Sequence, residues 1–184
     1  MKIFTITALA AISAMHCFAA GTIVVESRKA DGTQNKPAWS EVSGKWGNSK
    51  NKTRAADSSS LVATNVSACV TNSPVPAIKI SPELEAGTTY KVEVTFSTSA
   101  SYAAASDLIV AVSADGVSAS TIPTNTPAFQ GSGANDWNAL GTITPSTKNP
   151  TLTFTYVSGT LSHESRWYAD AVRFTAEAAP KKTE

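Results

Sequence analysis

Strict alternation of apolar and polar side chains is the feature that most limits how this chain can fold. In residues 89–97, apolar Tyr, Val, Val and Phe occupy every second position, starting at Tyr90. Residues 150–157 repeat the pattern, with Leu, Phe and Tyr between threonines. Because successive side chains of a strand point to opposite faces of a sheet, both segments are predicted to be strands with one buried face.

Other segments predict strands less strongly. In residues 168–175, Tyr168, Val172 and Phe174 share a parity with Asp170. Shorter candidates are residues 22–26, 78–80 and 109–112, and 61–66 is weaker still. Residues 48–60, rich in Ser, Thr and Asn, predict a loop or an edge region, and no segment of ten or more residues has a convincing helical pattern.

Turn-forming residues separate these segments. They occur at Asp31-Gly32, Glu85-Ala-Gly87, Asp115-Gly116 and Asn149-Pro150, and such residues accept the backbone geometry of tight turns. Strands at turn-bounded intervals with no helices between them favour antiparallel sheets over a parallel one. We therefore predict an all-β fold, an antiparallel β-sandwich.

Composition argues against two classes of binding protein. The 184 residues include 15 Lys+Arg and 14 Asp+Glu, a formal net charge of +1. A nucleic-acid binder would show a basic face, and a protein held on a membrane surface by charge would show a polybasic segment. The length suits a single domain with short tails.

The first twenty residues have the pattern of a secretory signal peptide. Lys2 precedes an apolar stretch that ends at Phe18, and Ala19-Ala20 supplies the small residues of a cleavage site. We expect a signal peptide at 1–20, a domain at 21–176 and a flexible tail at 177–184, with no membrane span. The mature protein would be extracellular, periplasmic or on the cell surface.

Removal of the signal peptide changes the residue counts. Losing Lys2 from the 15 basic residues leaves 14, which balance the 14 acidic residues. The mature chain keeps one cysteine, Cys69, and one histidine, His163. One cysteine excludes an internal disulfide, so Cys69 is either a buried thiol or half of an intermolecular disulfide.

Several stretches together resemble a known family. They are Ile23-Val-Val-Glu26, Gly44-Lys-Trp46, Ala86-Gly-Thr-Thr-Tyr90 running into Val92-Glu-Val94, Trp137-Asn-Ala-Leu140-Gly141, and Tyr168-Ala-Asp-Ala-Val-Arg-Phe174. Their order and spacing resemble the golvesin-type domain, which is similar to the carbohydrate-binding domain of xanthan lyase. The resemblance covers nearly the whole mature chain and implies a jelly-roll-like β-sandwich. It implies carbohydrate binding by association with secreted hydrolases, lyases and peptidases.

The aromatic residues supply the candidate ligand site. Carbohydrate-binding faces use Trp and Tyr rings, because the hydrogens of a pyranose stack on a flat aromatic surface. Trp39, Trp46, Trp137, Trp167 and Tyr102 are candidates because they lie in or beside predicted loops. Of these we take Trp39, Trp167 and Tyr102 as the ligand-binding residues, and the alternative for each is structural packing. The resemblance implies that Trp46 and Trp137 are structural residues that fill the core.

Asp170 has two interpretations. By parity it points inward, and a buried carboxylate is costly unless it is hydrogen-bonded, paired or bound to a metal. A structural role, accepting backbone N–H groups or pairing with Arg166 or Arg173, is one interpretation. The other is a structural calcium ion held by Glu26 and Asp170, since calcium favours carboxylate and carbonyl oxygens.

Catalytic motifs are missing from the sequence. His163 lies in Ser162-His163-Glu164-Ser165, and adjacency of Ser and His in sequence is not triad geometry. Neither Gly-x-Ser-x-Gly nor His-Glu-x-x-His occurs. We therefore expect no catalytic residues and, apart from calcium, no cofactor.

The sequence favours a secreted, non-catalytic module that binds extracellular carbohydrate or cell-surface glycan. The alternative is a self-assembling structural protein of a surface layer, matrix or fibre, because balanced charge offers little repulsion to association. An enzyme with an unrecognised site is the third interpretation. No catalytic domain accompanies the module, so we expect it to act alone, to assemble or to recruit a partner.

Overall fold

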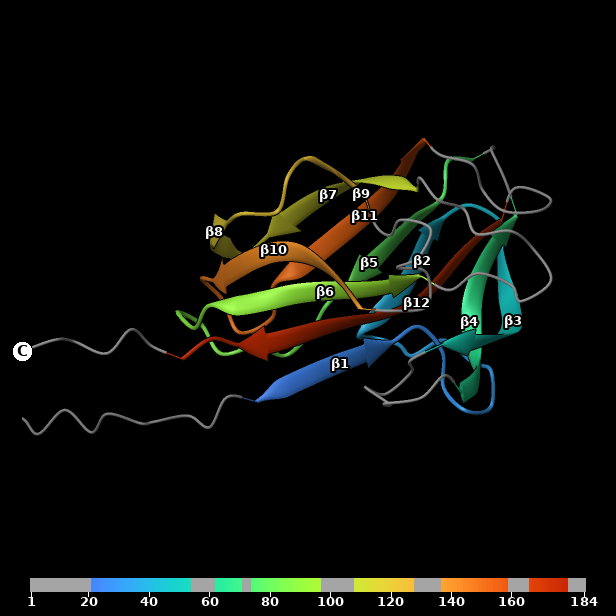
Figure 1. Ribbon diagram of the computed structural model, residues 1–184, viewed down its shortest axis with the longest axis horizontal. Coiled ribbons are helices and arrows are strands. Elements are labelled where there is room, and N and C mark those ends of the chain that lie inside the picture. Colours follow the sequence, from blue (N-terminus) through green and yellow to red (C-terminus); the bar gives the residue numbers. More distant parts are fainter. Residues whose placement is uncertain are drawn as a thin grey trace, which may run out of the picture.

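The computed structural model describes residues 21–53, 62–70, 74–96, 108–127, 137–158 and 166–178. The predicted signal peptide 1–20, Tyr102, His163 and most of the predicted tail lie outside these residues. Twelve strands occur in the described part (Figure 1). They are β1 (Thr22–Glu26), β2 (Trp39–Ser43), β3 (Trp46–Thr53), β4 (Val62–Val70), β5 (Ala77–Ile80), β6 (Tyr90–Phe96), β7 (Ile109–Asp115), β8 (Val117–Ser120), β9 (Asn125–Pro127), β10 (Asn138–Pro145), β11 (Thr151–Ser158) and β12 (Arg166–Ala176).

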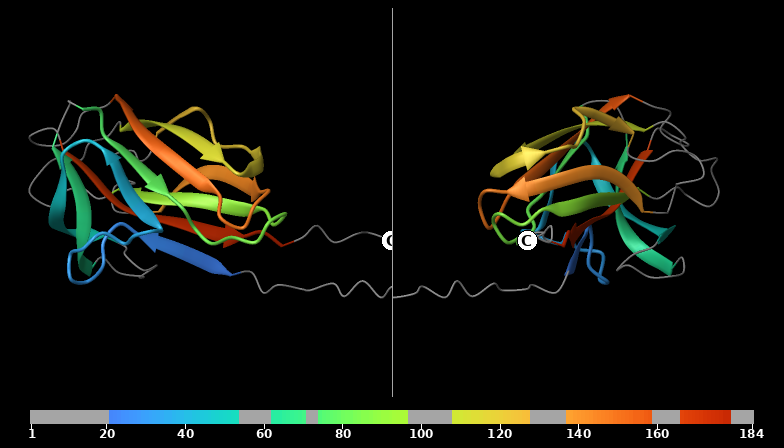
Figure 2. Two further views of the ribbon diagram at one scale, coloured as in Figure 1. Left: turned by 180° about the vertical axis from the view of Figure 1, so that it is seen from behind. Right: turned by 60° about the vertical axis from the view of Figure 1, so that its left-hand side comes forward.

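The strands form two sheets stacked face to face (Figures 1 and 2). The larger sheet has the order β3-β4-β12-β6-β10-β8, with β1 also paired to β12, and the smaller sheet has the order β2-β5-β11-β7-β9. Every pairing among the described strands is antiparallel. The chain changes sheet at each connection except that between β3 and β4. This winding confirms the predicted jelly-roll-like β-sandwich.

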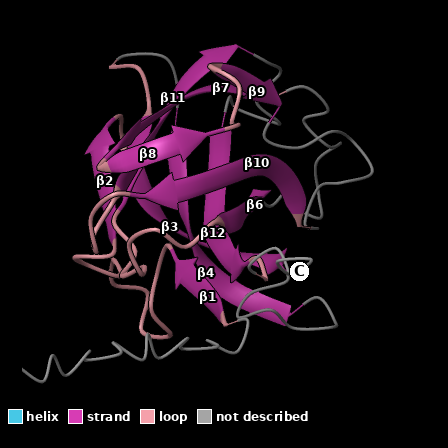
Figure 3. Cartoon of the chain, turned by 90° about the vertical axis from the view of Figure 1, so that its left-hand side faces the viewer, coloured by secondary structure: helices cyan, strands magenta, loops and turns pink. Residues whose placement is uncertain are grey.

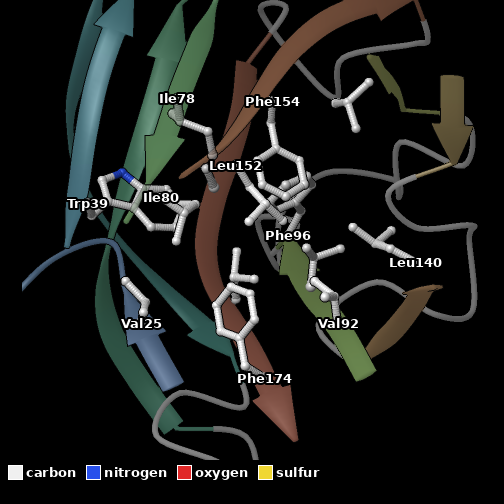
Figure 4. Packing of buried hydrophobic residues seen from close by; sticks show 14 of the residues in the cluster. Val25, Trp39, Ile78, Ile80, Val92, Phe96, Leu140, Leu152, Phe154 and Phe174 are labelled. Carbon is white, nitrogen blue, oxygen red and sulfur yellow. The ribbon is translucent and has the colours of Figure 1, made fainter. Parts of the chain in front are cut away.

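The core fills the space between the two sheets. Val92, Val94 and Phe96 of β6 are fully buried there, and Phe96 meets Phe154 of β11 edge-to-face at 6.3 Å between ring centroids. Figure 4 shows side chains of both sheets pointing toward one another in this layer. The alternation in both segments correctly predicts the face that enters the core. The prediction that only one face of β6 is buried was wrong, because Glu93 and Thr95 on its other face are also buried.

The strand β12 departs from simple alternation. Trp167 and Ala169 belong to the core, but so do Val172 and Phe174, which have the opposite parity. The pairing of β12 with β6 shifts register between Ala169 and Ala171, and this bulge exchanges the two faces. Tyr168, predicted to share a face with Val172 and Phe174, instead packs in a separate cluster with two small β4 residues. That part of the parity prediction was wrong.

Several strands were missed because their sequences are short, polar or interrupted. β2, β8 and β9 have three to five residues each, and β10 loses its alternation at a bulge between Ala139 and Gly141. Residues 46–53 form β3 at an edge of the larger sheet, in agreement with an edge region rather than a loop. Residues 54–61 lie outside the described part.

The predicted turns lie where the strands end. Gly32, Gly87 and Gly116 have positive φ angles of 85°, 78° and 69°, a backbone conformation that favours glycine. Figure 3 shows strands and loops without a helix in the described residues. In that part of the chain no helix is long and apolar enough to cross a membrane.

Candidate functional site

Two of the predicted ligand-binding tryptophans lie in the hydrophobic core. The exposed fraction is 0% for Trp39 and 1% for Trp167. Figure 4 shows Trp39 beside Ile78 and Ile80, between the sheets. Neither ring offers a surface on which a sugar could stack, so the prediction that they bind a ligand at the surface is corrected. The third candidate, Tyr102, lies outside the described residues.

Trp46 supports this core from the edge. Its ring is half-buried and lies 5.3 Å from the ring of Trp167 between centroids. Its indole Nε1 donates a hydrogen bond of 2.5 Å to the main-chain oxygen of Ser43. The hydrogen bond to Ser43 joins the start of β3 to the end of β2.

Trp137 lies on the outer face of the larger sheet. Asn138 pairs with Val94, whose side chain is in the core, so alternation places the preceding residue on the opposite face. The guanidinium carbon of Arg173 lies 4.4 Å from the centroid of the Trp137 ring, within the distance of a cation–π contact. Trp137 is half-buried against this outer surface and does not fill the core, which corrects the role that the resemblance implied.

Glu93 organises the charges beside Trp137. Its carboxylate accepts hydrogen bonds from Arg173 Nε at 2.8 Å and from Lys91 Nζ at 2.6 Å, and Arg173 Nη2 lies 2.7 Å away. The Glu93 side chain is buried under these partners, while 47% of the Lys91 side chain is exposed. Charge-assisted bonds of this kind fix the donors in place. Arg173 is thereby held against both Glu93 and the indole.

Two buried polar atoms on this face lack a partner among the described residues. They are the indole Nε1 of Trp137 and the hydroxyl Oγ1 of Thr95. Asn138 pairs with Val94, so Trp137 lies level with Thr95 on the neighbouring strand. Buried polar groups are ordinarily hydrogen-bonded to protein or water. We name Trp137, Arg173, Glu93, Lys91 and Thr95 the outer-face cluster.

Asp170 and Glu26 come together at the β12 bulge. Glu26 pairs with Ala171, and the next residue, Ser27, donates its backbone N–H to the main-chain oxygen of Asp170 at 2.7 Å. The Asp170 side chain is fully buried. Calcium takes six to eight oxygen ligands, and the described residues contain no group of three or more His, Cys, Asp or Glu side chains suited to a metal. These two carboxylates alone do not make a calcium site, so calcium binding stays a prediction.

A buried ion pair joins the two sheets, and the sequence analysis missed it. Arg28 pairs with Glu41 of β2, and their side chains are 10% and 12% exposed. Ser67 of β4 donates its hydroxyl to Glu41 at 2.7 Å and accepts from Arg28 Nε at 3.2 Å. Arg28 also donates to the main-chain oxygen of Gly32 at 2.9 Å. Nothing in the local sequence pattern links residues that are this far apart in the chain.

Cys69 is a free thiol in the core. It is fully buried beside Trp167 of β12, with which it pairs in register. Burial raises the pKa of the Cys69 thiol, since the thiolate is poorly solvated there. This position corrects the idea of an intermolecular disulfide, because the sulfur is not accessible in the folded chain.

The fold is similar to part of a known enzyme structure. A xanthan lyase of Paenibacillus matches with a TM-score of 0.57 and 15% sequence identity, over 86% of this chain. The matched region makes up 13% of the lyase, so this chain corresponds to a small part of it. No protein-family model and no curated protein sequence match the chain. The comparison supports the predicted sandwich, and membership of the golvesin-type family stays a prediction.

Proposed function

We propose that this protein is a secreted, non-catalytic module that binds an extracellular carbohydrate on the outer face of the larger sheet. The outer-face cluster carries the proposal. Trp137 is an aromatic ring at the surface, fixed by Arg173 and flanked by hydrogen-bonding charged groups. Sugars bind through this combination, because the ring packs on the pyranose and polar groups bind the hydroxyls.

Two further observations support a carbohydrate ligand. The fold is similar to part of a xanthan lyase, an enzyme named for a polysaccharide. The N-terminal segment has the pattern of a signal peptide, which would bring the domain into contact with extracellular glycans. Both observations agree with a binding module, and the cluster supplies the chemistry.

A glycan array tests the proposal. The protein should bind at least one polysaccharide, and Trp137→Ala should weaken that binding by about five- to thirtyfold, as expected when a stacked aromatic worth about 1–2 kcal/mol is lost. Lys91→Ala should weaken it less, since an exposed charge contributes little. Lys148→Ala, at an exposed lysine outside the cluster, is the matched control and should bind like the parent.

The same polysaccharides test the absence of catalysis. Incubation with the protein should release no new reducing ends and no unsaturated sugar products. Binding that Trp137→Ala leaves unchanged, no binding to any glycan, or turnover of a bound polysaccharide would each contradict the proposal.

A further inference from the structure

An apolar row crosses one end of the smaller sheet on its outer face. It consists of Val42 in β2, Val75 just before β5, Val157 in β11, Ile109 in β7 and Pro127 in β9. The three valines are 56%, 49% and 45% exposed. Large exposed apolar side chains that adjoin one another mark an interaction surface.

The strand register brings four of these residues to the same end, and Val42 lies two to three residues farther into the sheet. Ala77 of β5 pairs with Ser43 of β2 and with Thr155 of β11. Ile109 of β7 pairs with the end of β11 on one side and with Pro127 on the other. The row therefore takes one residue from each of β2, β11, β7 and β9, and Val75 from the segment just before β5.

The rest of this outer face carries small side chains and few charges. Ile78 of β5 and Phe154 of β11 point into the core. Because side chains alternate along a strand, the residues next to them in each strand point outward. These outward residues are small, namely Ala77, Ala111, Ser113, Thr153 and Thr155. Among the described residues of this face the charged ones are Lys79 on β5 and Asp115 on β7, both exposed.

We propose that this face is the interface of a homodimer, in which two copies pack sheet to sheet. The two-fold axis would lie between the sheets, along β11, the middle strand of the five. That axis sets β5 of one copy against β7 of the other, and β2 against β9. Small side chains let two sheets approach to about 10 Å, as in ordinary sandwiches.

The apolar row is complementary to itself under this symmetry. Val157 lies on the axis and meets its own copy. Val75 on the β5 side meets Ile109 of the second copy on the β7 side. Val42, beside Ser43, is level with Asn125 of β9 and would meet that strand of the second copy. The contact between Val75 and Ile109 occurs twice and the Val157 contact occurs once, on the axis, as an isologous interface requires.

The charges are complementary as well. Lys79 pairs with Thr153, and Thr153 pairs with Ser113, so Lys79 would face Ser113 of the second copy. Asp115 lies two residues farther along β7, about 7 Å away, which a lysine side chain can reach. The positive charge lies on one side of the axis and the negative charge on the other. The symmetry therefore gives two Lys79–Asp115 pairs and opposes no like charges.

The size of the face predicts a weak dimer. The five strands have five, four, eight, seven and three residues. At about 4.8 Å between strands and about 3.4 Å per residue they cover roughly 440 Å² per copy. The total of roughly 900 Å² is in the range of weak, transient interfaces. The outer-face cluster lies on the other sheet, so the dimer would present two copies of it outward and could bind a polysaccharide bivalently.

Sedimentation velocity on the mature chain tests the dimer. From about 1 μM to about 1 mM, the range in which interfaces of this size dissociate, the average mass should rise from monomer to dimer. Lys79→Glu and Asp115→Lys should each weaken association by about tenfold or more, because each brings like charges together. The double reversal should restore it. Val157→Lys should abolish it by placing two lysines at the axis.

Thermal melts show whether these variants are folded, and substitutions at such exposed positions should leave stability nearly unchanged. A parent protein that stays monomeric throughout the range would overturn the proposal, whether the face is simply solvated or takes a different partner. Association that survives both single reversals, or that the double reversal fails to restore, would also overturn it.

Discussion

The tryptophans show how strongly burial decides the role of a residue. Trp39 and Trp167 were candidates because they lie beside predicted loops, yet both are enclosed by the core. Trp137, taken for a structural residue, lies on the outside under Arg173. Sequence alone could not separate these cases, because the position of a residue near a strand end does not say which face its ring enters.

The Arg28–Glu41 pair predicts how much the loss of one side chain lowers the free energy of unfolding. Arg28→Ala would leave Glu41 nearly buried without its cation, and breaking such a pair costs about 3 kcal/mol. Urea unfolding should show this loss in the free energy of unfolding. Lys29→Ala, at the exposed neighbouring position, should change stability by less than about 0.5 kcal/mol. An equal, small effect at both positions would show that the pair does not support the fold.

The buried thiol of Cys69 predicts a dependence of stability on pH. Its pKa in the folded chain is raised above the ordinary 9.0, so folding favours the protonated thiol. This contribution is fully present below the unfolded pKa and is lost as the pH rises through the folded pKa. The stability difference between the parent protein and Cys69→Ala should therefore shrink between about pH 7 and about pH 10. A difference that is constant or grows, measured by urea unfolding, would contradict the assigned burial.

At the level of elements, the strands that sequence predicts well are the regular ones. β6 and β11 alternate without interruption, and their apolar positions enter the core as expected. In β10 and β12 a bulge inserts one residue and exchanges the faces, which a two-residue period cannot foresee. The candidate site was hard to predict for the same reason, since it spans β6, β10 and β12.

The turn between β7 and β8 depends on glycine at position 116, and this predicts the effect of an alanine there on stability. Gly116 has φ of 69°, and a methyl group there would lie 2.7 Å from Thr147 Oγ1. Gly116→Ala should therefore cost about 1–2 kcal/mol of stability. Gly47, where a methyl group meets nothing within 4 Å, is the matched control and should tolerate alanine with a change near zero. Thermal melts that rank the two variants in the opposite order would refute this interpretation of the turn.

For the whole molecule, the two outer faces of the sandwich differ in chemistry. The larger sheet carries an aromatic ring among charged groups, and the smaller sheet carries valines among small uncharged side chains. The first suits a hydroxyl-rich ligand, and the second suits another flat protein surface. The small net charge of the chain, +1, opposes neither contact.

The four tryptophans of the chain allow the most direct test of the carbohydrate site. Each indole N–H gives one signal in a proton–nitrogen correlation spectrum, and substitution by phenylalanine assigns the signals. Addition of a bound polysaccharide should shift the Trp137 signal and leave those of Trp39 and Trp167 in place. Shifts confined to the buried tryptophans, or an unmoved Trp137 signal at saturation, would contradict binding at the outer-face cluster.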